Sequence, residues 1–308
     1  MTITNLLGIK YPIFQGAMAQ IARHELVSAV SNAGALGILA SGGVSPEELR
    51  KEIQQCKELT DKPFAVNLML MMPNIDEIID VVIEEGVKIV TTGAGTPRKF
   101  IPRLKEAGIK VIPVIPSVKA AVKMEELGCD AVVVEGMEAG GHVGTSTTMA
   151  LLPQVTSAVN IPVIAAGGIA DGRGMAAAYC LGASGVQMGT VFLASEECPV
   201  TDAYKNMILE AVDTSTTLTG EKFGAPVRGI KNELTKRYHE LEKQSSTLME
   251  LEELTLGSLR RAVYDGDVEN GSVMAGQIAG LVNEIRPVKN IIEDVIKEAR
   301  EVLKKTEI

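Results

Sequence analysis

The chain is poor in aromatic side chains and has no long apolar run. Tryptophan is absent, and aromatic residues make up 3% of the 308 residues. No apolar stretch reaches the roughly 18 residues of a transmembrane helix, so no membrane partner is expected. The amino terminus lacks the basic segment, apolar run and small-residue cleavage site of a secretory signal. The protein is therefore expected in the cytoplasm.

Basic residues and cysteines are also scarce. Lysine and arginine number 30 against 39 acidic residues, which gives a formal net charge of −9. A duplex nucleic-acid binder needs an electropositive surface that displaces counterions, so nucleic acid is excluded as a partner. Isolated thiols in apolar segments are expected to be buried and reduced. The four cysteines are far apart, with no C-x-x-C pair: Cys56, Cys129, Cys180 and Cys198.

The common motifs of several enzyme classes are missing as well. There is no P-loop, no H-E-x-x-H and no G-x-S-x-G, which removes the usual routes to triphosphate, zinc-protease and serine-hydrolase chemistry. No metal site is expected. The segment 92–98 has two glycines of a dinucleotide fingerprint, but Arg98 replaces the third and Pro97 interrupts the pattern. We therefore exclude a Rossmann site.

What the chain has in abundance is glycine, with 30 residues, and a repeat of strand and helix. Short apolar runs rich in β-branched residues suit parallel strands that are covered on both faces. Amphipathic stretches with helical spacing, such as 74–85, separate them. Glycines are predicted to end several helices, as at Gly86, Gly108 and Gly128. The eight predicted strands are 13–15, 36–39, 64–68, 88–91, 111–114, 131–134, 163–166 and 185–188.

Eight strand–helix units of this size predict an α/β fold, a (β/α)8 TIM barrel. An open doubly wound sheet would leave eight strands in a row without an obvious switch point. The alternation stops after Phe192, and polar helical stretches follow. We predict a barrel domain over 1–197, a small helical cap inserted after the eighth strand over 198–270, and a return to the barrel over 271–308. Helical spacing at 272–282 and 288–303 predicts pocket closure and a final helix in the outer ring.

Two glycine turns follow the last two predicted strands. Gly167 and Gly168 come after the seventh strand, before a helix that opens near Asp171, and Gly189 precedes Thr190 after the eighth. Barrels bind phosphate at these positions, where backbone N–H groups and a helix N-terminus face the anion. A single such turn is best explained as a tight connection. The pair predicts a phosphate site.

The segment 135–144, EGMEAGGHVG, directly follows the sixth predicted strand. Its four glycines give a loop that can lie flat against a planar ligand. His142 stands within it, at the carboxyl end of a barrel strand, where catalytic residues occur. His24 and His239 lie in predicted helices and are expected to be solvated. His142 is therefore the candidate catalytic residue, with a structural histidine as the alternative.

Seven segments together resemble the FMN-dependent class II enoyl-acyl carrier protein reductases. These reductases belong to a wider group that includes the nitronate monooxygenases, once called 2-nitropropane dioxygenases. The AAGGIADG and Gly-Gly-His segments are shared by the wider group, whereas MEAGGHVG with SVMAGQIAGL resembles the reductase branch more closely. The seven segments are YPIFQGAMA, FAVNLML, TTGAGTP, EGMEAGGHVG, IPVIAAGGIADG, VQMGT and GSVMAGQIAGL.

The resemblance implies that FMN lies across the barrel mouth. The residues that would meet the flavin rings are Gly16, Ala17, Met18, Asn67, Gly140 and Gly141, with Glu135 as a further contact. The residues that would surround the phosphate are Gly167, Gly168, Gly189 and Thr190, with Gln187 and Met188 nearby. Those that would close the pocket are Met274, Gly276 and Gln277. A monovalent cation is a further expectation, with carbonyl oxygens of the GSVMAG turn as its ligands, and so is a homodimer.

The resemblance also implies a reaction. Hydride passes from NADH or NADPH by way of the flavin to the β-carbon of a trans-2-enoyl thioester on acyl carrier protein. His142 would donate a hydrogen bond to the thioester oxygen or a proton to the α-carbon. In the alternative, a nitronate monooxygenase, the same histidine would abstract a proton next to a nitro group and O2 would reoxidise the flavin. A non-redox, phosphate-binding barrel is the third hypothesis.

An acidic carrier protein would need a local basic patch on this acidic chain. The predicted cap offers five candidates for such a docking surface. A solvated helix face that Glu233, Glu240 and Glu242 balance explains them equally well. The candidates are Lys222, Arg228, Lys231, Lys236 and Arg237.

Overall fold

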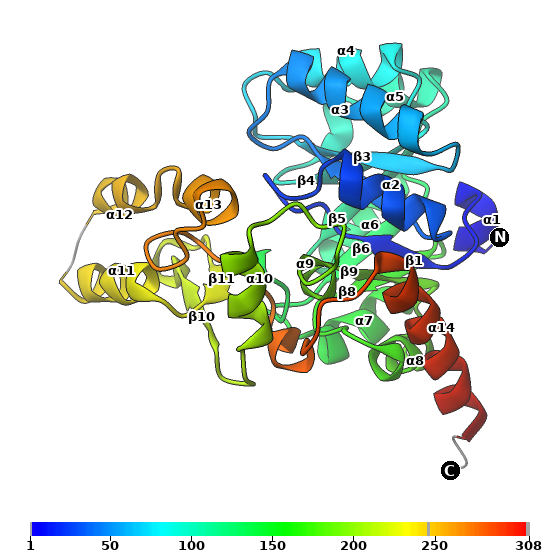
Figure 1. Ribbon diagram of the computed structural model, residues 1–308. Coiled ribbons are helices and arrows are strands. Elements are labelled where there is room, and N and C mark those ends of the chain that lie inside the picture. Colours follow the sequence, from blue (N-terminus) through cyan, green and yellow to red (C-terminus); the bar gives the residue numbers. More distant parts are fainter. Residues whose placement is uncertain (1, 245–246, 306–308) are drawn as a thin grey trace.

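Eight parallel strands form a closed barrel in the computed structural model, which describes residues 2–244 and 247–305 (Figure 1). Their order is β1-β9-β8-β6-β5-β4-β3-β2, and a parallel bridge between Phe14 and Leu36 joins the two end strands. The predicted (β/α)8 barrel is thus confirmed. The strands are β1 Ile13–Gln15, β2 Gly37–Ala40, β3 Phe64–Met69, β4 Ile89–Gly93, β5 Lys110–Ile115, β6 Val132–Glu135, β8 Val163–Ala166 and β9 Gly185–Met188.

Helices between the strands form the outer ring. Three of them are followed by the predicted glycine stops, since Gly86, Gly108 and Gly128 have positive φ angles of 66°, 71° and 80°. No helix of the described residues is long and apolar enough to cross a bilayer. The ring helices are α2 His24–Asn32, α3 Pro46–Leu59, α4 Ile75–Glu84, α5 Ile101–Glu106, α6 Val118–Glu126, α7 Thr148–Thr156 and α8 Gly172–Cys180, with the 3-10 turn η1 Pro97–Lys99 before α5.

Two apolar clusters hold the barrel together. One lies between the strands and the helices, and the other fills the barrel interior with side chains such as Phe14, Leu36 and Ile164. The short amino-terminal helix α1 (Ile3–Leu7) contributes Ile3 and Leu7 to the interior cluster. The interior is therefore a packed core, which leaves the loops at the carboxyl ends of the strands to form a site.

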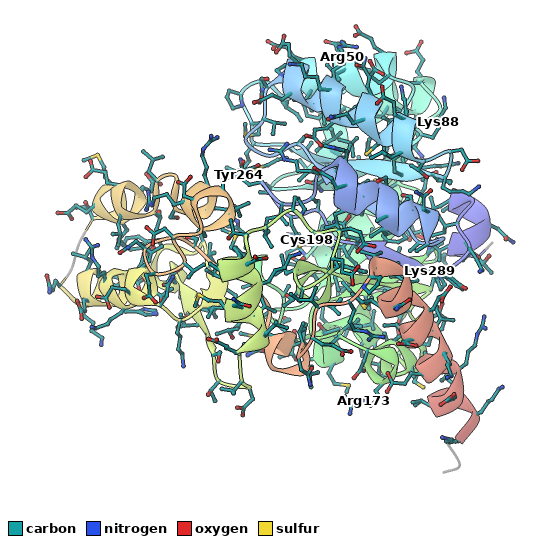
Figure 2. All side chains as sticks on the ribbon, in the orientation of Figure 1. Arg50, Lys88, Arg173, Cys198, Tyr264 and Lys289 are labelled. Atoms are coloured by element: carbon teal, nitrogen blue, oxygen red, sulfur yellow. The ribbon has the colours of Figure 1, made fainter. Side chains whose placement is uncertain are left out.

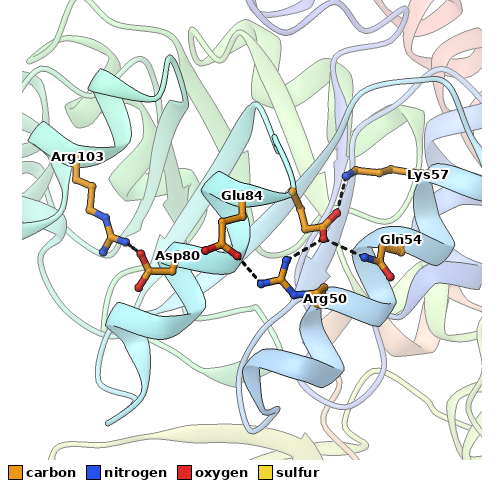
Figure 3. A network of polar contacts seen from close by, with 7 residues as sticks. Arg50, Gln54, Lys57, Asp80, Glu84 and Arg103 are labelled. Atoms are coloured by element: carbon orange, nitrogen blue, oxygen red, sulfur yellow. Dashed lines mark hydrogen bonds and ion pairs between the residues drawn. The ribbon is translucent and has the colours of Figure 1, made fainter.

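Ion pairs join three neighbouring ring helices on the outside (Figure 3). Arg50 of α3 contacts Glu84 and Glu85 at the end of α4, and Lys57 of α3 also reaches Glu85, at 2.7 Å. Arg103 of α5 pairs with Asp80 of α4. Exposed pairs of this kind each contribute little stability, so the apolar contacts beneath them dominate.

The cap contains strands as well as helices, so the prediction of a purely helical cap is incomplete. β10 (Thr216–Thr219) and β11 (Val227–Ile230) form an antiparallel hairpin, and β11 also pairs with β7 (Gly141–His142) from the loop after β6. Figure 1 shows the cap standing beside the barrel. The short helix α9 (Thr190–Leu193) follows β9 in the barrel. The other elements of the cap are α10 Asp202–Leu209, η2 Glu221–Phe223, α11 Glu233–Lys243, α12 Leu248–Thr255, α13 Ser258–Arg260 and the π-helix η3 Arg261–Asp265.

The returning segment differs from its prediction in one part. The predicted helix over 272–282 is wrong, because only the 3-10 turn η4 (Gln277–Leu281) forms there and the residues before it are irregular. The last helix, α14 (Val288–Lys305), starts where it was predicted and packs on α8 and α2 of the outer ring.

Contact between α8 and α14 depends on the absence of a side chain at Gly172. A Cβ atom there would lie 2.3 Å from the backbone nitrogen of Ala299. We expect Gly172→Ala to push α14 outward and to lower the free energy of unfolding by about 1–3 kcal/mol. Gly93→Ala is the matched control, because a Cβ at Gly93 has nothing within 4 Å. Equal melting temperatures for the two variants would contradict the expected docking of α14.

Candidate functional site

Two adjoining cavities open at the carboxyl ends of the barrel strands. The glycine cavity, of about 90 Å³, lies among Gly16, Gly167, Gly168, Gly189 and Gly276. The histidine cavity, of about 260 Å³, lies next to it and reaches His142. They form one elongated space because they share a wall: Ala17, Met18, Glu135, Gly140, Gly189 and Thr190.

All the predicted site residues except Gln277 line this space. The side chain of Gln277 is exposed, and its backbone N–H donates to the carbonyl oxygen of Glu138 at 2.9 Å. The next residue, Ile278, lines the glycine cavity instead. The remaining predicted residues lie as follows: Gln187 and Met188 in the glycine cavity, and Asn67, Gly141, His142 and Met274 in the histidine cavity.

The turn after β8 is built to present backbone N–H groups. Gly167 and Gly168 both have positive φ, 92° and 75°, and within the described part of the chain their amides donate to no other group. A Cβ atom on Gly189 would meet only the Met18 sulfur, at 3.7 Å, so the space in front of Gly189 is open. Loop amides of this kind bind anions.

The helix that follows this turn contributes less than predicted. Asp171 caps α8, and its carboxylate accepts hydrogen bonds from the backbone N–H groups of Arg173 and Gly174 at 3.0 and 3.1 Å. The first amides of α8 are therefore already paired. An anion in the glycine cavity would be held mainly by the loop amides.

Glu138 and Thr148 fix the turn to the loop after β6. The Glu138 carboxylate accepts from the backbone N–H of Thr148 at 2.9 Å, and the Thr148 hydroxyl lies 2.9 Å from the carbonyl oxygen of Gly167. Glu138 also lines the glycine cavity. Because the N-terminus of α7 satisfies its carboxylate, this acidic side chain tolerates an anion site beside it.

Glycines of the loop after β6 allow close contact with the returning segment. A Cβ on Gly140 would lie 2.7 Å from the backbone carbon of Ala275, and one on Gly276 would lie 2.6 Å from the oxygen of Glu138. The amide of Gly276 donates to the Thr190 hydroxyl at 2.8 Å. From the sequence, Gly140 is predicted to let the loop lie flat against a planar ligand. In the structure it is also required by the protein's own backbone packing.

His142 is positioned by strand pairing with the cap. It lies opposite Val227 in the β7–β11 ladder, and the neighbouring Val143 amide donates to Pro226 at 3.1 Å. The His142 side chain is exposed and lines the histidine cavity. The other histidines are half-buried and bonded rather than solvated: His24 to Glu52 at 3.0 Å and His239 to Thr217 at 3.1 Å.

Arg228 belongs to this ladder, opposite Gly141, and its side chain is buried and not on the surface. It is 4% exposed and donates to the carbonyl oxygen of Met137 at 3.0 Å and to the Thr216 hydroxyl at 3.1 Å. Burial lowers the pKa of its guanidinium. The predicted basic docking patch is therefore wrong for Arg228. Of the other candidates, Lys231 donates to the oxygen of Thr214 at 2.7 Å.

Glu135 ends β6 and faces both cavities. Burial raises the pKa of its carboxyl group to about 7. The other titratable side chains that line the two cavities are Glu138 and His142. Glu135 is thus the acidic group in this space whose charge the protein does not compensate.

The GSVMAG turn uses its carbonyl oxygens within the protein. The oxygen of Val273 accepts from Ile230, at 2.8 Å, and that of Met274 accepts from the Tyr204 hydroxyl, at 3.0 Å. These bonds fix the returning segment against the cap. The monovalent cation stays a prediction.

Sequence reasoning missed several lining residues. Glu138 stands inside a segment that was singled out, but its role depends on its contact with Thr148. Leu259 enters the histidine cavity from the cap and carries no local signal. The missed residues of the glycine cavity are Glu138, Ala139, Ala166, Ile169 and Ile278, and those of the histidine cavity are Ala19, Ile21, Ala40, Gly42, Met69, Leu193, Leu259 and Ala275.

The residues present fit a riboflavin phosphate. The glycine cavity offers unpaired amides for a phosphate, and the wider histidine cavity combines apolar walls with Asn67 and His142. Such a site, with few polar groups in an apolar cleft, is typical of cofactor pockets.

Known proteins resemble the chain over nearly its whole length. The family model described as nitronate monooxygenase matches residues 1–78 and 74–298. A probable nitronate monooxygenase from Staphylococcus saprophyticus is 37% identical, over 98% of both chains. The (3aS,4S,5R,7aS)-5-hydroxy-7a-methyl-1-oxo-octahydro-1H-indene-4-carboxyl-CoA dehydrogenase of Mycobacterium tuberculosis is 36% identical, over 96% of this chain and 95% of that protein.

Solved structures agree with this assignment. FabK from Thermotoga maritima is 51% identical, with a TM-score of 0.96 over 99% of this chain and 98% of that chain. A nitroalkane oxidase from Streptomyces ansochromogenes is 28% identical, with a TM-score of 0.88 over 98% of this chain and 99% of that one. The chain therefore belongs to the nitronate monooxygenase family and is a flavin-dependent oxidoreductase.

Proposed function

We propose that the chain is an FMN-dependent enoyl-acyl carrier protein reductase of fatty-acid synthesis, which reduces trans-2-enoyl thioesters with NADH or NADPH. The observation that carries this proposal is the 51% identity to FabK over the whole chain, against 37% for the probable nitronate monooxygenase. The relative from Mycobacterium tuberculosis is by its name a dehydrogenase of a carboxyl-CoA compound, so thioester substrates occur among relatives. Nitronate monooxygenase is the second candidate, favoured by the family description.

In this proposal the glycine cavity and the histidine cavity bind different parts of the ligands. Bound FMN would supply the hydride transfer. The amides of Gly167 and Gly168 would hold its phosphate, and Asn67 and Met18 would contact its rings in the histidine cavity. Apolar side chains there suit an acyl chain: Met69, Leu193, Leu259 and Met274.

His142 would act on the thioester. Its backbone is fixed by the pairing of β7 with β11, while its side chain is free to approach a ligand in the histidine cavity. Negative charge develops on the thioester oxygen when hydride reaches the β-carbon, and a hydrogen bond from imidazole would stabilise it. Alternatively, the same imidazole would deliver the proton to the α-carbon.

Anaerobic flavin absorbance separates the two functions. A reductase should lose its flavin absorbance when mixed with NADH or NADPH and regain it when a crotonyl thioester is added. A nitronate monooxygenase should instead be bleached by an alkyl nitronate. Stopped-flow spectra with each compound in turn would decide. Bleaching by nitronate but by neither nicotinamide would overturn the proposed function.

Replacing His142 tests its role. For His142→Ala we expect bound flavin and a rate of reduction by NADH within a few-fold of wild type, because the histidine acts on the other substrate. Reoxidation by crotonyl thioester should slow by about a hundredfold or more. His239→Ala, which removes a histidine bonded to Thr217 in the cap, is the control. Wild-type reoxidation in His142→Ala would refute the assignment.

The affinity for FMN should depend on pH through Glu135. Its pKa of about 7 means that it is largely protonated below that pH and ionised above it. An ionised carboxylate in the same space repels the phosphate, so wild-type affinity should weaken relative to Glu135→Gln as the pH rises from about 6 to about 8.

Fluorescence titration of FMN into both apoproteins provides the measurement. The phosphate of FMN itself titrates in this range, but it does so for both proteins, so the ratio of their Kd values isolates Glu135. We expect this ratio of wild type to variant to grow several-fold. A ratio that stays constant across the pH range would show that Glu135 is not the titrating group.

A further inference from the structure

A tyrosine at the junction of cap and barrel brings two arginines together. The hydroxyl of Tyr264, in η3, donates to the carbonyl oxygen of Gln20 at 2.9 Å and accepts from Arg23 Nη2 at 3.1 Å. The guanidinium of Arg260 lies over the Tyr264 ring, 5.4 Å from its centroid. Figure 2 shows Tyr264 where the cap faces the barrel. We call Arg23, Arg260 and Tyr264 the junction cluster.

The junction cluster adjoins the histidine cavity. Ala19 and Ile21, on either side of Gln20, line that cavity, and so does Leu259, the residue before Arg260. Arg23 therefore stands two positions beyond Ile21 on the barrel side of the cavity, and Arg260 stands next to Leu259 on its cap side. A ligand that extends from the histidine cavity toward the junction would approach both arginines.

Both guanidinium groups have N–H donors to spare. Neither makes an ion pair within 4.0 Å in the part of the chain that the structure describes, and only Arg23 donates a hydrogen bond, to Tyr264. Arg260 is exposed and Arg23 is half-buried. By contrast, the guanidinium of Arg261, the next residue after Arg260, donates hydrogen bonds to the carbonyl oxygens of Leu256 and Asn270.

Carboxylates near Arg23 are bonded to other groups: Glu25 and Glu52 approach Nδ1 of His24 at 3.4 and 3.0 Å. Glu48 lies in range of Arg23 and Lys51, but its carboxylate accepts the backbone N–H of Ser45 at 2.8 Å, and that bond is the main cause that lowers the pKa of Glu48. Asp265 follows Tyr264 and is exposed. Among the described residues the two arginines of the cluster thus have no ion-pair partner within 4.0 Å, in a chain whose overall net charge is −9.

We propose that Arg23 and Arg260 form a recognition site for the phosphate ester of an exchanging reactant. Guanidinium groups match phosphate oxygens through paired N–H donors. The inference rests on the proposed function, whose reactants all carry phosphate esters away from the reacting atoms: the diphosphate of NADH or NADPH, and the phosphopantetheine of a carrier or coenzyme A thioester. Tyr264 sets the spacing of the two arginines.

Four substrates and three variants separate the sources of the phosphate. The variants are Arg23→Gln, Arg260→Gln and their double, with Arg300→Gln on the exposed side of α14 as the control. If the thioester phosphate binds here, the KM for crotonyl-CoA rises about tenfold per substitution, while that for crotonyl-N-acetylcysteamine, which has no phosphate, is unchanged. If the nicotinamide phosphates bind here, the KM for NADH or NADPH rises and both thioesters are unaffected.

Two kinetic results would overturn the proposal. One is an unchanged KM for every substrate in the double variant. The other is an equal rise for crotonyl-CoA and crotonyl-N-acetylcysteamine, since a general disturbance of the cavity does not distinguish substrates by their phosphates. In the supporting outcomes kcat stays within about twofold of wild type, because the arginines do not touch the reacting atoms.

A binding measurement keeps this proposal separate from the proposed function. Calorimetric titration of the holoenzyme with coenzyme A, and separately with ADP-ribose, needs no turnover. Binding to wild type that weakens about tenfold in the arginine variants supports the site, even if the enzyme fails to reduce crotonyl thioesters. Affinities for both probes that do not change in the variants, or no binding of either probe to wild type, would refute it.

Discussion

The whole site depends on one backbone contact, between the loop after β6 and the segment that returns from the cap. The backbones of Gly140 and Ala275 approach so closely that a Cβ on Gly140 would not fit. Across the same boundary, the backbone N–H of Gln277 donates to the carbonyl oxygen of Glu138. Each segment walls both cavities. Residues about 135 positions apart in the sequence thus form one wall, and the Thr190 hydroxyl, which accepts from Gly276, ties that wall to the end of β9.

The same arrangement makes the cap part of the site. β7 consists of Gly141 and His142 alone, and a strand so short exists only because β11 pairs with it. Arg228 of β11 stabilises the pairing through its bonds to Met137 and Thr216, at the cost of burying a charge whose bonds are to neutral oxygens. The barrel supplies the location of the catalytic candidate, and the cap supplies its orientation.

The sequence was informative where a local pattern has a local cause. Buried parallel strands need apolar runs, and the glycine turns after β8 and β9 need positive φ or open amides, so both could be predicted. The hairpin β10–β11 could not, because its short half-polar strands alternate only weakly and are defined by pairing with β7. Gln277 was assigned to the pocket by the family resemblance, which does not specify side-chain direction, and in the 3-10 turn its neighbour Ile278 lines the cavity instead. Arg228 was predicted at the surface because no pattern in the neighbouring residues indicates its burial.

The proposed resident cofactor and the proposed exchanging reactant would meet different kinds of polar groups. The glycine cavity has no lysine or arginine among its lining residues, and an anion there would meet backbone amides of a turn fixed by Thr148 and Glu138. Rigid, neutral donors favour a ligand by geometry and suit a resident cofactor. Arg23 and Arg260, the proposed recognition site, are instead half-buried and exposed, so solvent screens their charge and a reactant could be attracted and released at each turnover. A cofactor held by dipoles and reactants steered by charges can therefore occupy neighbouring positions without competing for the same groups.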